Sequence, residues 1–131
     1  MTSELYLLTA SIGLGLVQIV LASQAASWQR GYRWTASARD EAMPPLAGVA
    51  GRLDRALRNF LETFPFFAAA VLMASVLGRH NMLTLLGAHF YFWARLAYVP
   101  LYAWGVPLVR SLVWNVATIG IVLVLAGLFW T

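Results

Sequence analysis

Residues 52–67 read RLDRALRNFLETFPFF, and this stretch decides the fold. It holds three arginines, two acids and an asparagine, and it runs without a break into an apolar segment, residues 64–77. That segment is shorter than the roughly 20 residues that a helix needs to cross a bilayer. Gly78, Arg79 and His80 prevent its extension toward the C-terminus. The membrane-spanning helix must therefore be completed on its N-terminal side, which draws polar residues to membrane depth.

These polar residues share one side of the predicted helix. At about 100° per residue they occupy a sector of roughly 80°. The sector contains Arg52, Arg55, Asn59 and Glu62, with Arg58 at its edge. An ionised group near the bilayer centre costs on the order of 2.5–3.5 kcal/mol to insert. The stripe is therefore expected to face protein or a water-filled cavity, although arginines at a helix end can also reach the headgroups.

The composition predicts an all-α integral membrane protein. The chain has 131 residues, of which 61% are hydrophobic and only 11% charged, and its mean hydropathy is +0.73. The apolar runs are long and continuous, which favours spanning helices over a membrane barrel. A net charge of +4 without a basic stretch argues against nucleic acid as a partner. The sequence has no cysteine, and every basic residue apart from the two histidines is arginine.

The pattern predicts one domain, residues 1–131, built as a bundle of four transmembrane helices. The helices are expected at residues 5–26, 49–78, 82–104 and 108–130. The one long connection, residues 27–51, carries tryptophans and tyrosine suited to the membrane interface and ends at a Pro-Pro pair. Together with its helix flanks, it carries five of the nine arginines, namely Arg30, Arg33, Arg39, Arg52 and Arg55. By the positive-inside rule this loop is expected to be cytoplasmic and both termini outside.

A second polar stripe is predicted on residues 82–104. Tyr91, Arg95, Tyr98 and Tyr102 recur at the spacing of one helical face. Aromatic side chains at this spacing more often pack against neighbouring helices than act in a site, but the arginine among them favours a site. His89 lies off that face, and we interpret it as an ordinary hydrogen-bonded or interfacial histidine.

The charges near the loop side favour an anionic ligand. Arg55, Arg58, Arg95 and Arg110 together outnumber Glu62. With nearby tyrosines and an asparagine, they suit a small molecule with more than one carboxylate or phosphate. Glu62 is expected to pair with Arg55 or Arg95, or to accept from a ligand ammonium. No metal is expected, since the two histidines stand apart and no metal-binding motif occurs.

Here the residues resemble a known family. The sequence RLDRALRNFLETFPFF, followed about 30 residues later by ARLAYVPLY and by an arginine at the start of the last helix, is similar to the MAPEG family, the membrane-associated proteins of eicosanoid and glutathione metabolism. The pattern R-x-x-x-N-x-x-E-x-x-P and the pattern A-R-x-x-Y-x-x-x-Y occur in the family's order. The similarity extends over nearly the whole chain and is that of a bacterial-type member.

The resemblance implies a homotrimer that binds glutathione between neighbouring subunits on the cytoplasmic side, here of a bacterial inner membrane. Arg110 then corresponds to the catalytic arginine that stabilises the thiolate. The remaining glutathione contacts implied by the resemblance are Arg55, Asn59, Glu62, Tyr98 and Tyr102, with Arg52 and Arg33 at the basic rim. Thr63 departs from the pattern, because some eicosanoid-pathway members have a tyrosine there.

The leading hypothesis from the sequence is a glutathione-dependent transferase or peroxidase. Such an enzyme activates the thiol of bound glutathione toward a lipophilic electrophile or hydroperoxide that arrives through the membrane. The expected partners are therefore membrane lipids and a lipophilic small molecule. Two alternatives stay open. One is a non-catalytic scaffold or lipid-binding protein whose arginines hold phospholipid headgroups. The other is a small transporter that uses Glu62 as its coupling carboxylate.

Overall fold

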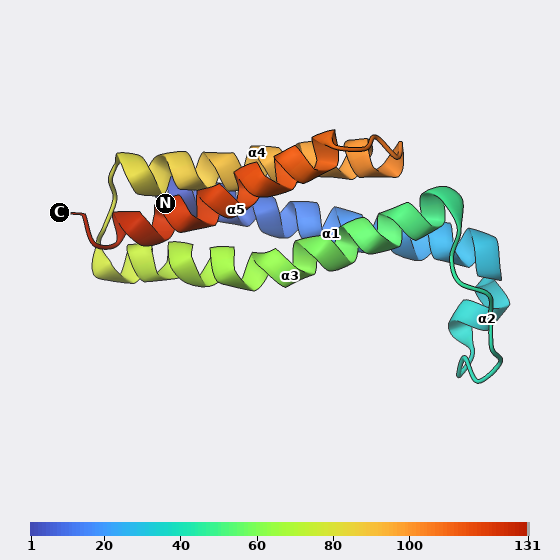
Figure 1. Cartoon of the computed structure of the whole chain (residues 1–131). Coiled ribbons are helices and arrows are strands. Elements are labelled where there is room, and N and C mark those ends of the chain that lie inside the picture. Colours follow the sequence, from blue (N-terminus) through green and yellow to red (C-terminus); the bar gives the residue numbers. More distant parts are fainter. Residues whose placement is uncertain (131) are drawn as a thin grey trace.

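The computed structural model describes residues 1–130, in which all regular structure is helical. Four helices are long and one is short. Their order is α1 (Ser3–Arg30), α2 (Tyr32–Ala36), α3 (Gly48–Leu77), α4 (Met82–Ala103) and α5 (Val109–Gly127). The long helices lie side by side with both chain termini at one end of the bundle (Figure 1). Thr131, the last residue of the expected domain, lies outside the described residues.

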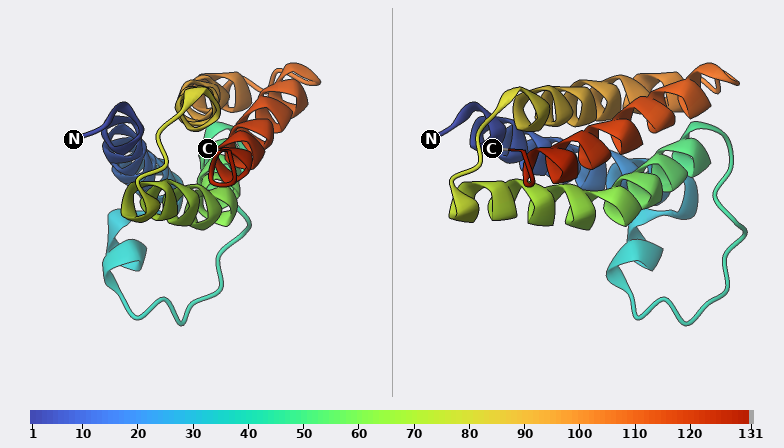
Figure 2. Two further views of the ribbon diagram at one scale, coloured as in Figure 1. Left: turned by 90° about the vertical axis from the view of Figure 1, so that its left-hand side faces the viewer. Right: turned by 60° about the vertical axis from the view of Figure 1, so that its left-hand side comes forward.

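The bounds of α1 and α5 differ from expectation, and α1 already begins at Ser3 rather than at residue 5. α1 continues past residue 26 to Arg30, because no glycine or proline interrupts it before Gly31, whose φ of 95° stops the helix. α5 ends at Gly127 rather than at residue 130. The connection expected to be irregular also contains α2, which projects with its loop beside the bundle (Figure 2). The remaining long helices, α3 and α4, begin and end within one residue of the predicted bounds.

The bundle is organised around α3 and α4. Within the described residues α3 packs against each of the other long helices, whereas α1 and α5 do not contact each other and lie on opposite sides (Figure 2). Phe67 and Tyr91 stack at a ring distance of 4.0 Å in the buried core. α4 and α5 approach most closely where glycines meet, since a Cβ on Gly87 would lie 2.5 Å from the Gly120 carbonyl oxygen.

Hydrogen bonds fasten the end of the bundle that lies opposite the long loop. The buried carboxylate of Glu4, in α1, accepts from the Thr84 hydroxyl of α4 at 2.8 Å. The Asn81 side chain caps α4 and its amide nitrogen donates to the Gly127 carbonyl at 2.8 Å. These hydrogen bonds join three helix ends, namely the start of α1, the start of α4 and the end of α5.

Three helices, α1, α3 and α5, are long and apolar enough to cross a membrane. α4 has sufficient length, 22 residues, but His89, Arg95 and its tyrosines lower its hydropathy. α3 reaches this length only by including the polar stretch before Pro65, as its sequence requires. Figure 1 shows that α3 bends in its middle part, consistent with a proline inside the helix.

Candidate functional site

The centre of the candidate site is the guanidinium of Arg95, which is only 1% exposed. Its Nη1 donates to Asn59 Oδ1 of α3 at 2.7 Å. Its Cζ lies 4.3 Å from the Tyr98 ring centre and 5.7 Å from that of Phe60. Nε and Nη2 are buried without a hydrogen-bond partner, and no carboxylate of residues 1–130 lies within ion-pair distance. This cation therefore retains buried donors for an anion.

Tyr102 brings two further arginines to the same end of the bundle. Its hydroxyl accepts from Arg55 Nε at 3.0 Å, and the Cζ of Arg110 lies 5.1 Å from its ring centre. The Tyr102 ring in turn lies 5.4 Å from the ring of Tyr98. Arginines from α3, α4 and α5 thus meet around two tyrosines, and no acid pairs with any of the three within the described chain. The local charge of about three positive units favours an anion.

The turn before α5 sets the position of Arg110. Gly105, at φ 72°, ends the turn that follows α4, and Leu108, at φ 63°, immediately precedes α5. A positive φ is strained for a leucine. Arg110 stands in the first helical turn after it, so its guanidinium reaches back over α4 toward Tyr102.

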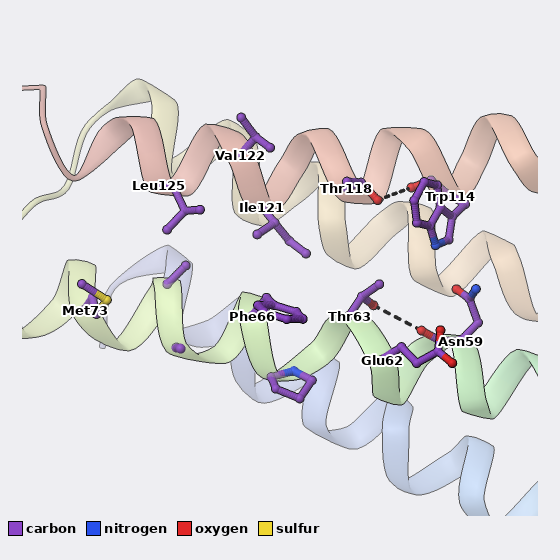
Figure 3. A pocket seen from close by; sticks show the side chains of 13 residues that line it. Asn59, Glu62, Thr63, Phe66, Met73, Trp114, Thr118, Ile121, Val122 and Leu125 are labelled. Atoms are coloured by element: carbon purple, nitrogen blue, oxygen red, sulfur yellow. Dashed lines mark hydrogen bonds between the residues drawn. The ribbon is translucent and has the colours of Figure 1, made fainter.

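Two cavities meet beside this cluster. The smaller, of about 270 Å³, is polar and lies between α3, α4 and the start of α5. The larger, of about 780 Å³, runs between α3 and α5 and is mostly apolar (Figure 3). Asn59 and Trp114 line both cavities. The two cavities are therefore adjacent. The smaller cavity is lined by Asn59, Tyr98, Arg110, Ser111, Trp114 and Asn115.

The structure brings together most of the residues predicted for the site. Asn59, Tyr98 and Arg110 line the polar cavity, while Arg55 and Tyr102 are linked to it through the contacts above. Glu62 lies at the polar end of the apolar cavity, next to Asn59 (Figure 3). The expected pairing of Glu62 with Arg55 or Arg95 is wrong for this arrangement, because no salt bridge to Glu62 occurs within residues 1–130.

The other arginines of the sequence pattern point elsewhere. Arg52 Nε donates to the Ala103 carbonyl at 2.8 Å, which ties the start of α3 to the end of α4. Arg33 is exposed in α2. Arg58 pairs with Asp54 at 3.3 Å and contacts neither Tyr98 nor Tyr102, although it lines a cavity near the long loop that Arg55 also lines. Arg58 is thus not part of the cluster in which the sequence counted it.

Sequence reasoning gave no role to three residues that line the polar cavity, Ser111, Trp114 and Asn115. Together with Arg110 they occupy one face of α5, at the first, second, fifth and sixth positions of a two-turn stretch. That spacing was visible in the sequence. The sequence alone did not indicate that this face of α5, rather than an adjacent face, packs toward α3. Among the described residues, no group of three or more His, Cys, Asp or Glu side chains gathers where a metal could bind.

Comparison with models of protein families now adds to this geometry. Residues 7–130, almost the whole chain, match the model described as the MAPEG family. The chain belongs to the MAPEG family. This MAPEG protein is therefore an integral membrane protein, and its family includes glutathione transferases and peroxidases as well as other members. No curated protein matches the sequence in a direct comparison.

Proposed function

We propose that this MAPEG protein is a membrane enzyme that binds glutathione at the arginine cluster and activates its thiol. The observation that carries the proposal is Arg95, a buried cation with two unpartnered nitrogens and no carboxylate partner in the described chain. Holding such a charge at membrane depth is costly unless an anion neutralises it. Glutathione supplies two carboxylates and one ammonium, which matches a cluster that is rich in arginine and has one acid at its border.

Each neighbouring side chain has a role in this proposal. The carboxylates of glutathione are held by Arg55 and Arg95, with hydrogen bonds from Asn59 and the two tyrosine hydroxyls. Glu62 accepts from the ammonium. Arg110 lies beside the thiol and favours its deprotonated form, which is the nucleophile. Outer contacts at the basic rim are assigned to the Arg52 nitrogens that do not bond Ala103 and to the exposed side chain of Arg33.

The apolar cavity suits the second substrate. Its wall includes Phe66, Ile121 and Leu125, and its polar end meets the glutathione cavity at Asn59 and Trp114. In the transfer reaction the thiolate sulfur forms a bond to an electrophilic carbon, and the leaving group departs with the electron pair. In the peroxidase reaction two glutathione molecules are oxidised to the disulfide while a hydroperoxide is reduced to an alcohol and water. Glutathione is the only co-substrate proposed, and no metal takes part.

The proposed assembly is a homotrimer of four-span subunits. α4 is included as the fourth span because it packs antiparallel to α5 and α3, both of which qualify as spans. Phe66, in the wall of the α3–α5 cavity, is 67% exposed in the single chain. A neighbouring copy that covers this side would complete the site between subunits. The loop then faces the cytoplasm of a bacterial inner membrane, with both termini outside.

Isothermal titration of the detergent-purified protein with glutathione tests this function. We expect saturable binding in the wild type and its loss in an Arg55→Ala, Arg110→Ala double variant. Arg58→Ala is the matched control, because Arg58 lies on the same helix but pairs with Asp54 outside the cluster. Turnover is then followed with 1-chloro-2,4-dinitrobenzene and with cumene hydroperoxide. Equal binding by the wild type and the double variant would reject the proposal and favour a scaffold whose arginines hold phospholipid headgroups.

A transporter is the second candidate, and one observation favours it. Glu62 is exposed at the border of the apolar cavity and has no ion-pair partner within residues 1–130, which leaves it available to a coupling cation. Flux into proteoliposomes that depends on Glu62 would support this candidate. Flux unchanged in Glu62→Gln would remove it.

A further inference from the structure

A separate apolar groove lies between α4 and α5. Its volume is about 350 Å³, and none of the residues that line it belongs to the arginine cluster or its two cavities. Its lining residues are His89, Phe90, Trp93, Ala94, Val113 and Val116. We propose that this groove binds a membrane-dissolved quinone, with His89 donating a hydrogen bond to one of the ring carbonyls. This inference does not rest on the proposed glutathione chemistry.

The hydrogen bond between Trp93 and His89 decides which proton the histidine carries. Trp93 Nε1 donates to His89 Nδ1 at 3.1 Å. An indole N–H can only donate, so His89 Nδ1 has no proton. The neutral imidazole must then carry its proton on Nε2. The bond from Trp93 therefore leaves Nε2 of His89 as a hydrogen-bond donor.

This donor has no acceptor in the described chain. The bond from Trp93 is the one hydrogen bond that His89 makes within residues 1–130. An N–H without a partner in hydrocarbon is costly, and no water is available there to relieve it. A ligand that brings an acceptor to the groove therefore gains the full hydrogen bond.

The depth of His89 limits what that ligand can be. His89 is seven residues from the start of α4 at Met82, about 10 Å along the helix axis. With α4 taken as the proposed fourth span, beginning at the edge of a hydrocarbon core of about 30 Å, the donor lies inside the hydrocarbon. Phospholipid ester groups lie at the interface, so they do not reach it. The acceptor must belong to a molecule that dissolves in the hydrocarbon itself.

The lining of the groove favours a flat neutral ring. It contains no arginine and no acid, so it offers nothing to a fatty-acid carboxylate or to a phosphate. The exposed rings of Phe90 and Trp93 provide aromatic faces, and Val113 and Val116 supply aliphatic surface from α5. A quinone combines a planar apolar ring, which stacks on aromatic side chains, with two carbonyl acceptors. It meets each of these conditions.

Photolabelling in nanodiscs tests the proposal. The probe is an azido-substituted decylubiquinone, and the labelled peptide is identified by mass spectrometry, with unlabelled decylubiquinone as competitor. We expect saturable labelling of α4 next to the groove. His89→Leu, which keeps the side chain apolar and of similar size, should weaken competition by decylubiquinone about tenfold, as the loss of one hydrogen bond predicts. Leu96→Ala is the matched control, since Leu96 is exposed on the same helix but does not line the groove.

A second competitor separates recognition of the carbonyl from simple partition. The dimethoxybenzene analogue of the same ring and tail lacks the carbonyl groups, and it should compete about tenfold less well than decylubiquinone. Equal competition by both compounds, or equal competition in wild type and His89→Leu, would overturn the proposal. Cross-linking of this face to another copy of the chain, with no quinone labelling, would also overturn it.

Discussion

At the level of single residues, Arg95 is the group on which the site depends. It is held by one hydrogen bond that it donates to Asn59 of α3 and by aromatic faces on two sides, so its position is set by packing rather than by an acid. Cation–π contacts of this kind stabilise a desolvated guanidinium without using its N–H groups. Two of the guanidinium nitrogens, Nε and Nη2, therefore stay without a hydrogen-bond partner within the described chain.

We expect Arg95→Lys to weaken glutathione binding tenfold or more. Lysine keeps the charge, but it lacks the planar fork that bonds a carboxylate while stacking on Tyr98. Isothermal titration gives the ratio of dissociation constants. Arg58→Lys is the control, because the exposed pair between Arg58 and Asp54 contributes at most about 1 kcal/mol. An Arg95→Lys affinity within twofold of wild type would contradict the role given to Arg95.

The hydrogen-bonded hydroxyls of Thr63 and Tyr91 predict that two substitutions lower the free energy of unfolding by unequal amounts. The Thr63 hydroxyl donates to the Phe60 carbonyl at 3.1 Å and accepts from Tyr91 OH at 3.0 Å. Thr63→Val leaves the buried Tyr91 hydroxyl without an acceptor and should cost about 1–3 kcal/mol. Tyr91→Phe leaves Thr63 bonded to the backbone and should cost less. Thermal unfolding in detergent compares the two variants, and the reverse order would show that Tyr91 has another acceptor.

At the level of the helices, the contact between α4 and α5 determines where Arg110 lies relative to Arg95. The two helices touch through Gly87 and Gly120, where neither has space for a side chain. This close approach brings the first turn of α5 against Tyr102 of α4. A shift between these helices would therefore alter the site as well as the core.

Gly87→Ala is expected to destabilise the protein by about 1–3 kcal/mol, because its methyl group would lie 2.5 Å from the Gly120 carbonyl oxygen and force the helices apart. Gly13→Ala is the matched control. A Cβ at Gly13 has nothing within 4 Å, and alanine favours the helix by roughly 0.5–1 kcal/mol over glycine. Unfolding temperatures of both variants check this. A Gly87→Ala protein as stable as Gly13→Ala would contradict the tight crossing.

The sequence predicted α3 and α4 closely because glycine, charge and proline mark their ends and the apolar runs between them are long. It did not predict the continuation of α1 to Arg30 or the five-residue α2. Both lie in a polar segment that has no hydrophobic periodicity from which a helix could be predicted. Helical spacing placed Arg55 with Asn59 on one helix and Tyr98 with Tyr102 on the next, since each stripe is local to one helix, and their common role in a site stays a prediction.

Helical spacing could not predict the contacts between the polar stripe of α3 and the stripes of the neighbouring helices. Arg58 turns outward to Asp54, and Glu62 lies beside the apolar cavity without an ion pair in the described chain. Packing against α4 and α5 fixes the rotation of α3 about its axis, and this rotation decides which neighbours these side chains meet. The apolar cavity is likewise a product of how two distant segments pack.

At the level of the whole molecule, the α3–α5 side of the bundle is expected to be an interface between copies. Because the chain has no cysteine, a single Phe66→Cys substitution supplies a clean cross-linking site on that side. We expect a thiol-reactive cross-linker to give covalent dimers in native membranes. Leu96→Cys, an exposed position on α4, is the control. Cross-linking at Leu96 but not at Phe66 would place the interface elsewhere and oppose the proposed trimer.

The central claim is that the arginine cluster activates the thiol of glutathione. The ultraviolet absorbance band of the thiolate, recorded as glutathione saturates the purified protein, tests it most directly. The account predicts a thiolate band at neutral pH in the wild type and its loss in Arg110→Ala, while Arg58→Ala keeps it. Saturable binding without that band, or a band of equal size in Arg110→Ala, would contradict the account.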